Sequence, residues 1–220
     1  MTIIPTTVID NFFDDADSIR AFALAQQYTA DSLGRWPGRR SLSLEQLHKQ
    51  LWAYTCNRML SAFWDVDAVP LHWSAQGAFQ LVDAQWGEGW VHQDADSLLT
   101  AIVYLTPNSQ VSAGTSIYRR RNRCDFVDPR WEDDKRAGYL SGNLTSPQYL
   151  HAQAATNALY ESTMQVGNVY NRLLIFDSSL YHGVEAFDTG STERLTLTMF
   201  FKSLATPMLN PMQRVNRCVD

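Results

Sequence analysis

The sequence predicts an α+β fold in which a layer of helices precedes a double-sheet β-sandwich. Apolar residues recur at helical spacing within about 14–63, before any strand pattern begins. Short strand-like runs separated by turn residues then fill about 70–118 and 167–203. The 220 residues contain neither an internal repeat nor a low-complexity linker, so we expect a single domain over 1–220.

The composition is that of a packed protein. Hydrophobic residues make up 45% and aromatic residues 12% of the chain, which is too apolar for a disordered protein. A net charge of −5 does not indicate a protein whose whole surface binds nucleic acid. The three widely spaced cysteines indicate neither a disulfide framework nor a thiolate zinc site. The N-terminus lacks a signal-peptide pattern, and no apolar run approaches the ~20 residues of a membrane span. We therefore expect a cytoplasmic protein with no membrane or nucleic-acid partner.

The helical layer is predicted from two N-terminal capping patterns. The aspartates at 14–15 can cap a helix that runs to about residue 27. Ser43-Leu44-Glu45-Gln46 is a capping box that opens a second helix, which we expect to run to about residue 63. The Gly, Pro and Arg residues between them, at 30–42, predict a loop.

The sandwich is predicted from short apolar or alternating runs. Residues 122–166 interrupt these runs and read as an insertion, in which Ser146 and Pro147 predict the start of a helix. Because long insertions in compact domains tend to be functional, this one is a candidate lid. The expected strands are Phe79–Asp83, Ser97–Leu105, Thr115–Tyr118, Arg172–Phe176, His182–Glu185 and Arg194–Phe201.

A metal site is predicted from His92-Gln93-Asp94. Residues two apart in an extended segment point the same way, with Cα atoms roughly 6.5–7 Å apart, so this imidazole and carboxylate can converge. One carboxylate and two histidines form the facial triad of non-haem Fe(II) oxygenases. His182 is the natural second histidine. Each histidine taken alone would more often be a core or turn residue.

The last strand predicts an anion site. Its period of two places Arg194, Thr196, Thr198 and Phe200 on one face and Leu195, Leu197, Met199 and Phe201 on the other. Both faces are largely apolar, so the strand is expected to be covered on both sides. A buried arginine needs a bound anion or an acidic partner. The same alternation after Asp94 aligns Thr100 with Tyr104, whose hydroxyl could be a second donor to the anion.

These residues together resemble the Fe(II)/2-oxoglutarate-dependent dioxygenases. The resemblance rests on His92-x-Asp94, Thr100-x-x-x-Tyr104-Leu105, His182 and Arg194 twelve residues later. It is nearest to the prolyl 4-hydroxylase-like branch and to a poorly characterised 2-oxoglutarate oxygenase family whose N-terminus resembles VIDNFFDDADSIRAFAL. It covers roughly 79–118 and 168–201 well and the N-terminal helices loosely, with a His-to-Arg spacing slightly longer than usual. It implies a double-stranded β-helix, the jelly-roll or cupin-like sandwich, with flanking helices.

The resemblance also implies the cofactors and their ligands. Fe(II) would be bound by His92, Asp94 and His182, and the distal carboxylate of 2-oxoglutarate by Arg194 with a hydrogen bond from Tyr104. Thr100, Thr196 and Thr198 would line the cosubstrate pocket, and Gln85 is the candidate for the contact to the iron-side carboxylate. The implied reaction consumes O₂, hydroxylates an unactivated C–H and releases succinate and CO₂. The carboxylate at 94 favours hydroxylation, since related halogenases carry a small residue there.

The prime substrate is not determined by these residues. It could be a small molecule or a peptidyl group, and Trp90, Asp96, Arg119 and Arg121 are the candidate contacts. The arginine run at 119–123 reads either as a solvated face or as a site for an anionic substrate. Trp36, Trp86 and Trp90 could line the pocket or pack in the core, and the oligomeric state stays open.

Three alternatives remain. Arg194 could form a structural ion pair with Glu185, Asp188 or Glu193. The chain could be a cupin-like metalloenzyme that does not use 2-oxoglutarate, which would need no buried cation facing the metal. It could also be a non-catalytic jelly-roll binding protein with a vestigial metal site.

Overall fold

Two antiparallel sheets pack against each other in the computed structural model, which describes residues 5–122, 130–187, 190 and 193–206. The larger sheet has seven strands in the order β1-β8-β5-β10-β4-β3-β2, and the smaller has three in the order β7-β6-β9. The strands are β1 (Thr7–Ile9), β2 (Thr29–Ala30), β3 (Arg39–Ser43), β4 (His72–Val82), β5 (Leu99–Tyr104), β6 (Thr115–Arg120), β7 (Tyr160–Val166), β8 (Arg172–Asp177), β9 (Tyr181–Gly183) and β10 (Arg194–Ala205). The α+β class predicted from the sequence is confirmed.

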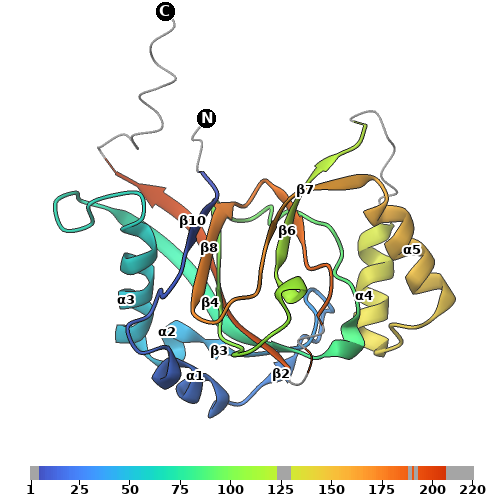
Figure 1. The fold of residues 1–220 in the computed structure, drawn as a ribbon, viewed down its shortest axis with the longest axis horizontal. Coiled ribbons are helices and arrows are strands. Elements are labelled where there is room, and N and C mark those ends of the chain that lie inside the picture. Colours follow the sequence, from blue (N-terminus) through green and yellow to red (C-terminus); the bar gives the residue numbers. More distant parts are fainter. Residues whose placement is uncertain (1–4, 123–129, 188–189, 191–192, 207–220) are drawn as a thin grey trace, which may run out of the picture.

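Five α-helices flank the sheets within the described residues. They are α1 (Ala16–Leu24), α2 (Leu44–Leu47), α3 (Lys49–Leu60), α4 (Trp131–Ser141) and α5 (Pro147–Asn157), with short 3₁₀ turns at Ala84–Trp86 and Val111–Ala113. Helices α1 to α3 lie beside the large sheet, and α4 and α5 lie together at the other side of the molecule (Figure 1). None of the helices in the described part of the chain has the length and apolarity to cross a membrane.

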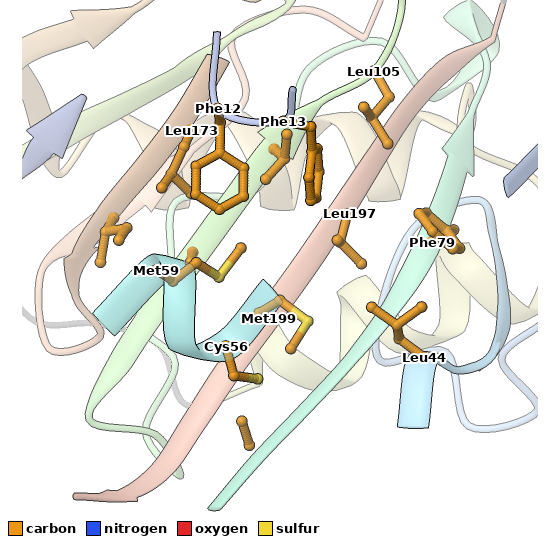
Figure 2. Packing of buried hydrophobic residues seen from close by; sticks show 14 of the residues in the cluster. Phe12, Phe13, Leu44, Cys56, Met59, Phe79, Leu105, Leu173, Leu197 and Met199 are labelled. Atoms are coloured by element: carbon orange, nitrogen blue, oxygen red, sulfur yellow. The ribbon is translucent and has the colours of Figure 1, made fainter. Parts of the chain in front are cut away.

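The strand β10 lies in the middle of the large sheet. It pairs with β4 on one side, where Arg194 is opposite Val82, and with β5 on the other, where Thr196 is opposite Tyr104. Its apolar face packs under the N-terminal helices, where Leu197 and Met199 lie near Met59 of α3 (Figure 2). This packing fixes the direction of the opposite face, which carries Arg194 and Thr196.

The opposite face of the large sheet meets the small sheet. Ile102, Tyr104, Leu174 and Phe176 come from the large sheet, and Ile117 and Val166 come from the small one. The large sheet is therefore covered on both faces, as its apolar strands predicted. The candidate site lies in the space between the sheets that this apolar cluster leaves open.

The helix starts are where the capping patterns predicted them. Asp15 caps α1, and Ser43 forms the predicted capping box with Gln46. The second predicted helix is wrong in one respect, because it is two helices. His48 ends α2 and caps α3, where its Nδ1 accepts a hydrogen bond of 3.1 Å from the Leu51 N–H.

Two predicted loops contain strands. Residues 30–42 were expected to be irregular, but β3 pairs with β4 there, with Arg40 opposite Gln80. The predicted insertion at 122–166 contains α4 and α5, with Ser146 and Pro147 at the predicted start of α5. It ends in β7, which pairs with β6, and its residues 123–129 lie outside the described residues.

Candidate functional site

Backbone pairing brings the three predicted metal ligands together. The backbone N–H of His92 donates to the carbonyl of His182 at 3.0 Å, and the return bond is 2.9 Å. Asp94 is held on the segment that leads to His182, because its N–H donates to the Ser178 carbonyl at 3.0 Å. One potential ligand atom from each of His92, Asp94 and His182 lies within 4.8 Å of the others. The described residues contain no other such group of three.

Both imidazoles are oriented by a carbonyl two residues earlier in the chain. His92 Nδ1 lies 2.8 Å from the Trp90 carbonyl, and His182 Nδ1 lies 2.9 Å from the Leu180 carbonyl. A carbonyl can only accept, so each Nδ1 carries the proton and each Nε2 has its lone pair free for a metal. The Nε2 atoms of His92 and His182 lie 3.7 and 3.3 Å from the Asp94 carboxylate.

The protonation states also suit a metal. Burial, together with the neighbouring His182, lowers the pKa of His92 to about 4. Burial acts to raise the pKa of Asp94, but the neighbouring His182 and His92 and the hydrogen bond from the Thr100 hydroxyl outweigh it, so this pKa falls well below its usual range. At neutral pH His92 is therefore neutral and Asp94 is ionised, as a divalent cation requires.

Arg194 is the second feature of the site. It is 4% exposed, and its guanidinium lies over the rings of Tyr104 and Phe187, at 5.4 and 5.9 Å. Its Nε donates to the Ala113 carbonyl at 2.7 Å, whereas its Nη2 is buried and has no partner. Burial lowers the pKa of Arg194. The side chain therefore presents an unused buried donor and an unneutralised charge.

The alternative reading of Arg194, a structural ion pair, does not hold for two of its three candidate partners. Glu185 accepts hydrogen bonds from Ser116 and Gln165, and Glu193 pairs with Arg39 at 2.7 Å. The third candidate, Asp188, lies outside the described residues.

The other predicted cosubstrate residues have different surroundings. The Tyr104 hydroxyl donates to Thr115 Oγ1 at 2.8 Å in the buried region beside Arg194. Thr196 Oγ1 is buried without a partner, and Thr198 lines the cavity. Thr100 donates to Asp94 Oδ2 at 2.6 Å, so its hydroxyl holds the carboxylate. Thr115 was missed because a threonine in a short strand carries no distinguishing signal.

A cavity of about 510 Å³ joins the two features, and His92, Asp94, His182 and Arg194 all line it. Both sheets, helix α4 and the segment at 35–37 contribute to its walls. The cavity is large enough for a small organic ligand.

The predicted substrate residues divide into two groups. Trp90 and Asp96 line this cavity, and the Trp90 indole N–H donates to the Tyr149 hydroxyl at 2.9 Å. Arg119 and Arg121 line a different cavity, where both form ion pairs with Glu161 across β6 and β7.

Three other candidate residues, Trp36, Trp86 and Gln85, differ in their position relative to the cavity. Trp36 lines the cavity, whereas Trp86 packs on Tyr139 with ring centroids 5.0 Å apart. Gln85 donates to the Asp83 carboxylate at 3.0 Å and is not among the residues that line the cavity. The sequence missed Arg40 and Lys135, which do line it.

Comparison with solved structures shows a shared fold. HygX from Streptomyces hygroscopicus, solved with nickel and 2-oxoglutarate bound, has a TM-score of 0.54 and 15% identity over 89% of this chain and 82% of that one. A prolyl hydroxylase from Trichoplax adhaerens, in complex with a hypoxia inducible factor peptide fragment, has a TM-score of 0.54 and 12% identity over 96% and 86%. SnoN, a non-heme alpha ketoglutarate dependent epimerase from nogalamycin biosynthesis, has a TM-score of 0.51 and 12% identity over 91% and 79%.

These neighbours confirm, at the level of the fold, the predicted resemblance to Fe(II)/2-oxoglutarate-dependent oxygenases, which includes the prolyl hydroxylases. No curated protein matches the sequence. A family model matches residues 3–201, and the chain therefore belongs to the family of unknown function DUF6445.

Proposed function

We propose that the chain is an Fe(II)- and 2-oxoglutarate-dependent oxygenase that hydroxylates an unactivated C–H of its substrate. One observation carries the proposal: a cavity holds the convergent His92, Asp94 and His182 together with the buried, unpaired Nη2 of Arg194. A metal site alone would not need this cation, whereas an anionic cosubstrate bound beside the metal would. The likeness to HygX, whose structure contains nickel and 2-oxoglutarate, supports the same assignment.

The triad is proposed to hold the iron. Two neutral imidazoles and one carboxylate on one side of an ion leave its remaining positions open, which is the donor set of the non-haem Fe(II) oxygenases. The backbone carbonyls of Trp90 and Leu180 fix the tautomers of the two histidines, and the Thr100 hydroxyl fixes the carboxylate. Because Asp94 itself fills a ligand position, the proposal favours hydroxylation over halogenation.

Arg194 is proposed to hold the distal carboxylate of 2-oxoglutarate through its free Nη2. Thr196 Oγ1, which is buried and lacks a partner on the same face of β10, supports a second polar contact there. Tyr104 would assist from β5, where its ring contacts the guanidinium and its hydroxyl is bonded to Thr115. Thr198, which lines the cavity nearby, would complete the cosubstrate pocket.

Iron and 2-oxoglutarate would supply O₂-dependent oxidation, with succinate and CO₂ as by-products. The chain itself orients the ligands and shields the reaction. Ile102 of the apolar cluster between the sheets lines the cavity, and Trp90, packed on Trp131 and Tyr149, forms part of the wall on the side of α4 and α5. This enclosure would limit the access of water to the reacting atoms.

The proposed enzyme is one domain over 1–220, built on a double-stranded β-helix. Within it, α4 and α5 are proposed to serve as the lid over the substrate, because α4 supplies Lys135 and Tyr139 to the cavity wall. A small molecule or a peptidyl group is the proposed substrate class, as for the neighbours with hygromycin B or a peptide fragment bound.

Anaerobic addition of Fe(II) and then 2-oxoglutarate tests the proposal. The chelate of both gives a weak visible charge-transfer band, and admission of O₂ should then release succinate at a slow uncoupled rate. A metal-binding protein without the band would be the cupin-like enzyme that does not use 2-oxoglutarate. A band that persists under O₂ without succinate would indicate a non-catalytic binding protein, and either result would overturn the proposal.

A further inference from the structure

The cavity has a charge that the proposed metal and cosubstrate do not explain. Six basic residues and three acidic residues line it, although the net charge of the chain is −5. Two of the basic residues are already neutralised, because Arg35 pairs with Asp31 at 2.9 Å and Arg136 pairs with Glu132 at 2.6 Å. Arg194 is assigned to 2-oxoglutarate above. Three cations remain, Arg40, Lys135 and Lys202, and none of them has a carboxylate within ion-pair distance among the residues that the structure describes. Lys202 is exposed to solvent, whereas Lys135 is buried and Arg40 is partly buried.

Arg40 is the first of these cations, and it is held rigidly. Its guanidinium lies over the Trp36 ring at 4.3 Å and near the Phe200 ring at 5.7 Å. Its Nη2 donates to Gln80 Oε1 at 3.3 Å, and Gln80 is itself oriented by donating to the Pro37 carbonyl at 2.7 Å. Its Nε is buried and has no partner, and Nη1 makes no hydrogen bond within the described part of the chain. The planar fork is thus positioned in advance and has donors unused.

Lys135 is the second cation, on the helix α4. It is 9% exposed, and its Nζ lies 4.7 Å from the centre of the Trp131 ring. No acidic side chain of the described residues pairs with it, unlike its helical neighbour Arg136. Burial lowers the pKa of both Lys135 and Arg40, and the negative charge of Asp94 opposes the shift in both. Both cations line the same cavity as Asp94.

A second anion would neutralise these charges. In the proposed holoenzyme, the two charges of 2-oxoglutarate are balanced by Arg194 and by the net charge of Fe(II) with Asp94. Apart from the solvent-exposed Lys202, Arg40 and Lys135 are left over, and an uncompensated cation in a poorly solvated site is strongly unfavourable. A group that supplies oxygen acceptors to a rigid guanidinium and an ammonium is a carboxylate or a phosphate.

We propose that Arg40 and Lys135 form an oxyanion subsite, separate from the cosubstrate site, which binds a carboxylate or phosphate group of the prime substrate beside the metal. That the bound anion belongs to the substrate rests on the proposed function. The anion site itself rests only on the two unpaired cations. It replaces the prediction that Arg119 and Arg121 bind the anion, since those two residues are paired with Glu161 in another cavity.

The test uses protein loaded with Ni(II) and saturating 2-oxoglutarate, so that Arg194 is occupied and no turnover occurs. Benzoate, phenyl phosphate and the neutral benzamide are titrated as probes by calorimetry. At least one anion is expected to bind at least about tenfold more tightly than benzamide. Tighter binding of phenyl phosphate identifies the phosphate source, and tighter binding of benzoate identifies the carboxylate source.

Two variants and two matched controls assign the site. Arg40→Gln and Lys135→Gln should each weaken the anion by at least about tenfold and leave benzamide unaffected. Arg35→Gln and Arg136→Gln remove cations that are already paired, so they should bind the anion within about twofold of wild type. Arg40→Lys keeps the charge but loses the planar guanidinium group, so it should bind the anion with intermediate affinity. This variant also tests the role of Arg40 if Arg40→Gln fails to fold.

Several outcomes would overturn the subsite. The first is that the wild type binds neither anion, and the second is that it binds benzamide as tightly as both anions. The third is that the variants of the paired cations lose as much anion affinity as the variants of Arg40 and Lys135. A separate titration with Ni(II) and 2-oxoglutarate alone tests the proposed function. If 2-oxoglutarate fails to bind in that titration while the anion probes bind as expected, the proposed oxygenase function is refuted and the anion site is retained.

Discussion

Thr100 donates a hydrogen bond of 2.6 Å to Oδ2 of Asp94, the carboxylate that lies nearest both imidazoles of the triad. The Ser178 hydroxyl lies 2.9 Å from the same threonine oxygen and completes the chain of hydroxyls behind the carboxylate. Thr100 belongs to the large sheet, whereas His182 belongs to the small one. This bond therefore fixes the Asp94 carboxylate relative to β5 of the large sheet, opposite the small sheet that carries His182.

Thr100→Val should weaken metal binding by about 10- to 100-fold, because it keeps the side-chain shape and removes the hydroxyl that orients Asp94. Thr100→Ser should restore most of the affinity. A Co(II) or Ni(II) titration of the three proteins measures the effect. Equal affinities in wild type and Thr100→Val would show that this hydrogen bond does not orient a ligand.

Asp94→Ala should abolish succinate production, because the metal loses its only anionic ligand among the described residues. Asp96→Asn is the matched control, since Asp96 lies on the same segment, is exposed and makes no ion pair within the described residues. Succinate formed from 2-oxoglutarate under air is the readout. Undiminished turnover by Asp94→Ala would remove the ligand assignment.

Arg194→Gln should raise the Kd for 2-oxoglutarate by at least about 30-fold, because it removes the charge proposed to pair with the distal carboxylate in a buried place. Arg194→Lys should recover part of the loss, since it keeps the charge without the fork. Titration of the visible chelate band gives the Kd directly. A 2-oxoglutarate affinity unchanged in Arg194→Gln would place the cosubstrate elsewhere.

Asn171 should contribute strongly to stability, because it holds the N-terminal segment on the large sheet. Its side chain accepts from the Phe13 N–H and donates to the Phe13 carbonyl, both at 2.8 Å and both buried. Asn171→Ala leaves these two backbone groups without partners, at about 1–3 kcal/mol each.

Asn108→Ala is the matched control for Asn171→Ala. Asn108 and Asn171 share a left-handed backbone, with φ of 53° and 61°, but the side chain of Asn108 is exposed and makes no hydrogen bond in the described structure. The free energy of unfolding measured in urea should therefore be lower for Asn171→Ala than for Asn108→Ala by about 2–6 kcal/mol. Equal losses would show that only the backbone conformation matters.

Cys56 should be unreactive toward a thiol reagent in the folded protein at pH 8. Its side chain is fully buried on the inner face of α3, and burial raises the pKa of its thiol to about 12, so the reactive thiolate is scarce. A variant with Cys124 and Cys218 replaced by serine isolates this thiol. Rapid labelling without urea would show that α3 opens from the sheet.

The same pKa has a consequence for stability at high pH. A thiol pKa that is raised by folding means that the unfolded chain releases the Cys56 proton first as the pH rises, so the free energy of unfolding falls in the alkaline range. Cys56→Ala should show a weaker alkaline decline in stability than the parent variant. An identical decline in both would assign it to other groups.

The sequence by itself determined the features that depend on local periodicity. The His92-x-Asp94 spacing, the face of β10 that carries Arg194 and the capping of α1 each follow from a few neighbouring residues and the geometry of a strand or helix. Each was predicted from the sequence, and the structure places them accordingly. Local geometry could not predict where His48 would divide a helix, because that depends on a side-chain cap competing with helix continuation.

The tertiary structure decided which charges are neutralised. Arg119 and Arg121 stand in a conspicuous arginine run, yet the pairing of β6 with β7 brings Glu161 to them. Arg40 stands in a stretch that reads as a loop, yet the pairing of β3 with β4 places it in the cavity of the triad. Strand pairing between distant segments sets these neighbours, and the free energy of a buried charge depends on its neighbours rather than on its own residue type. Local sequence therefore indicates the chemistry at the metal, whereas the cations that would select a substrate emerge only from the assembled sheets.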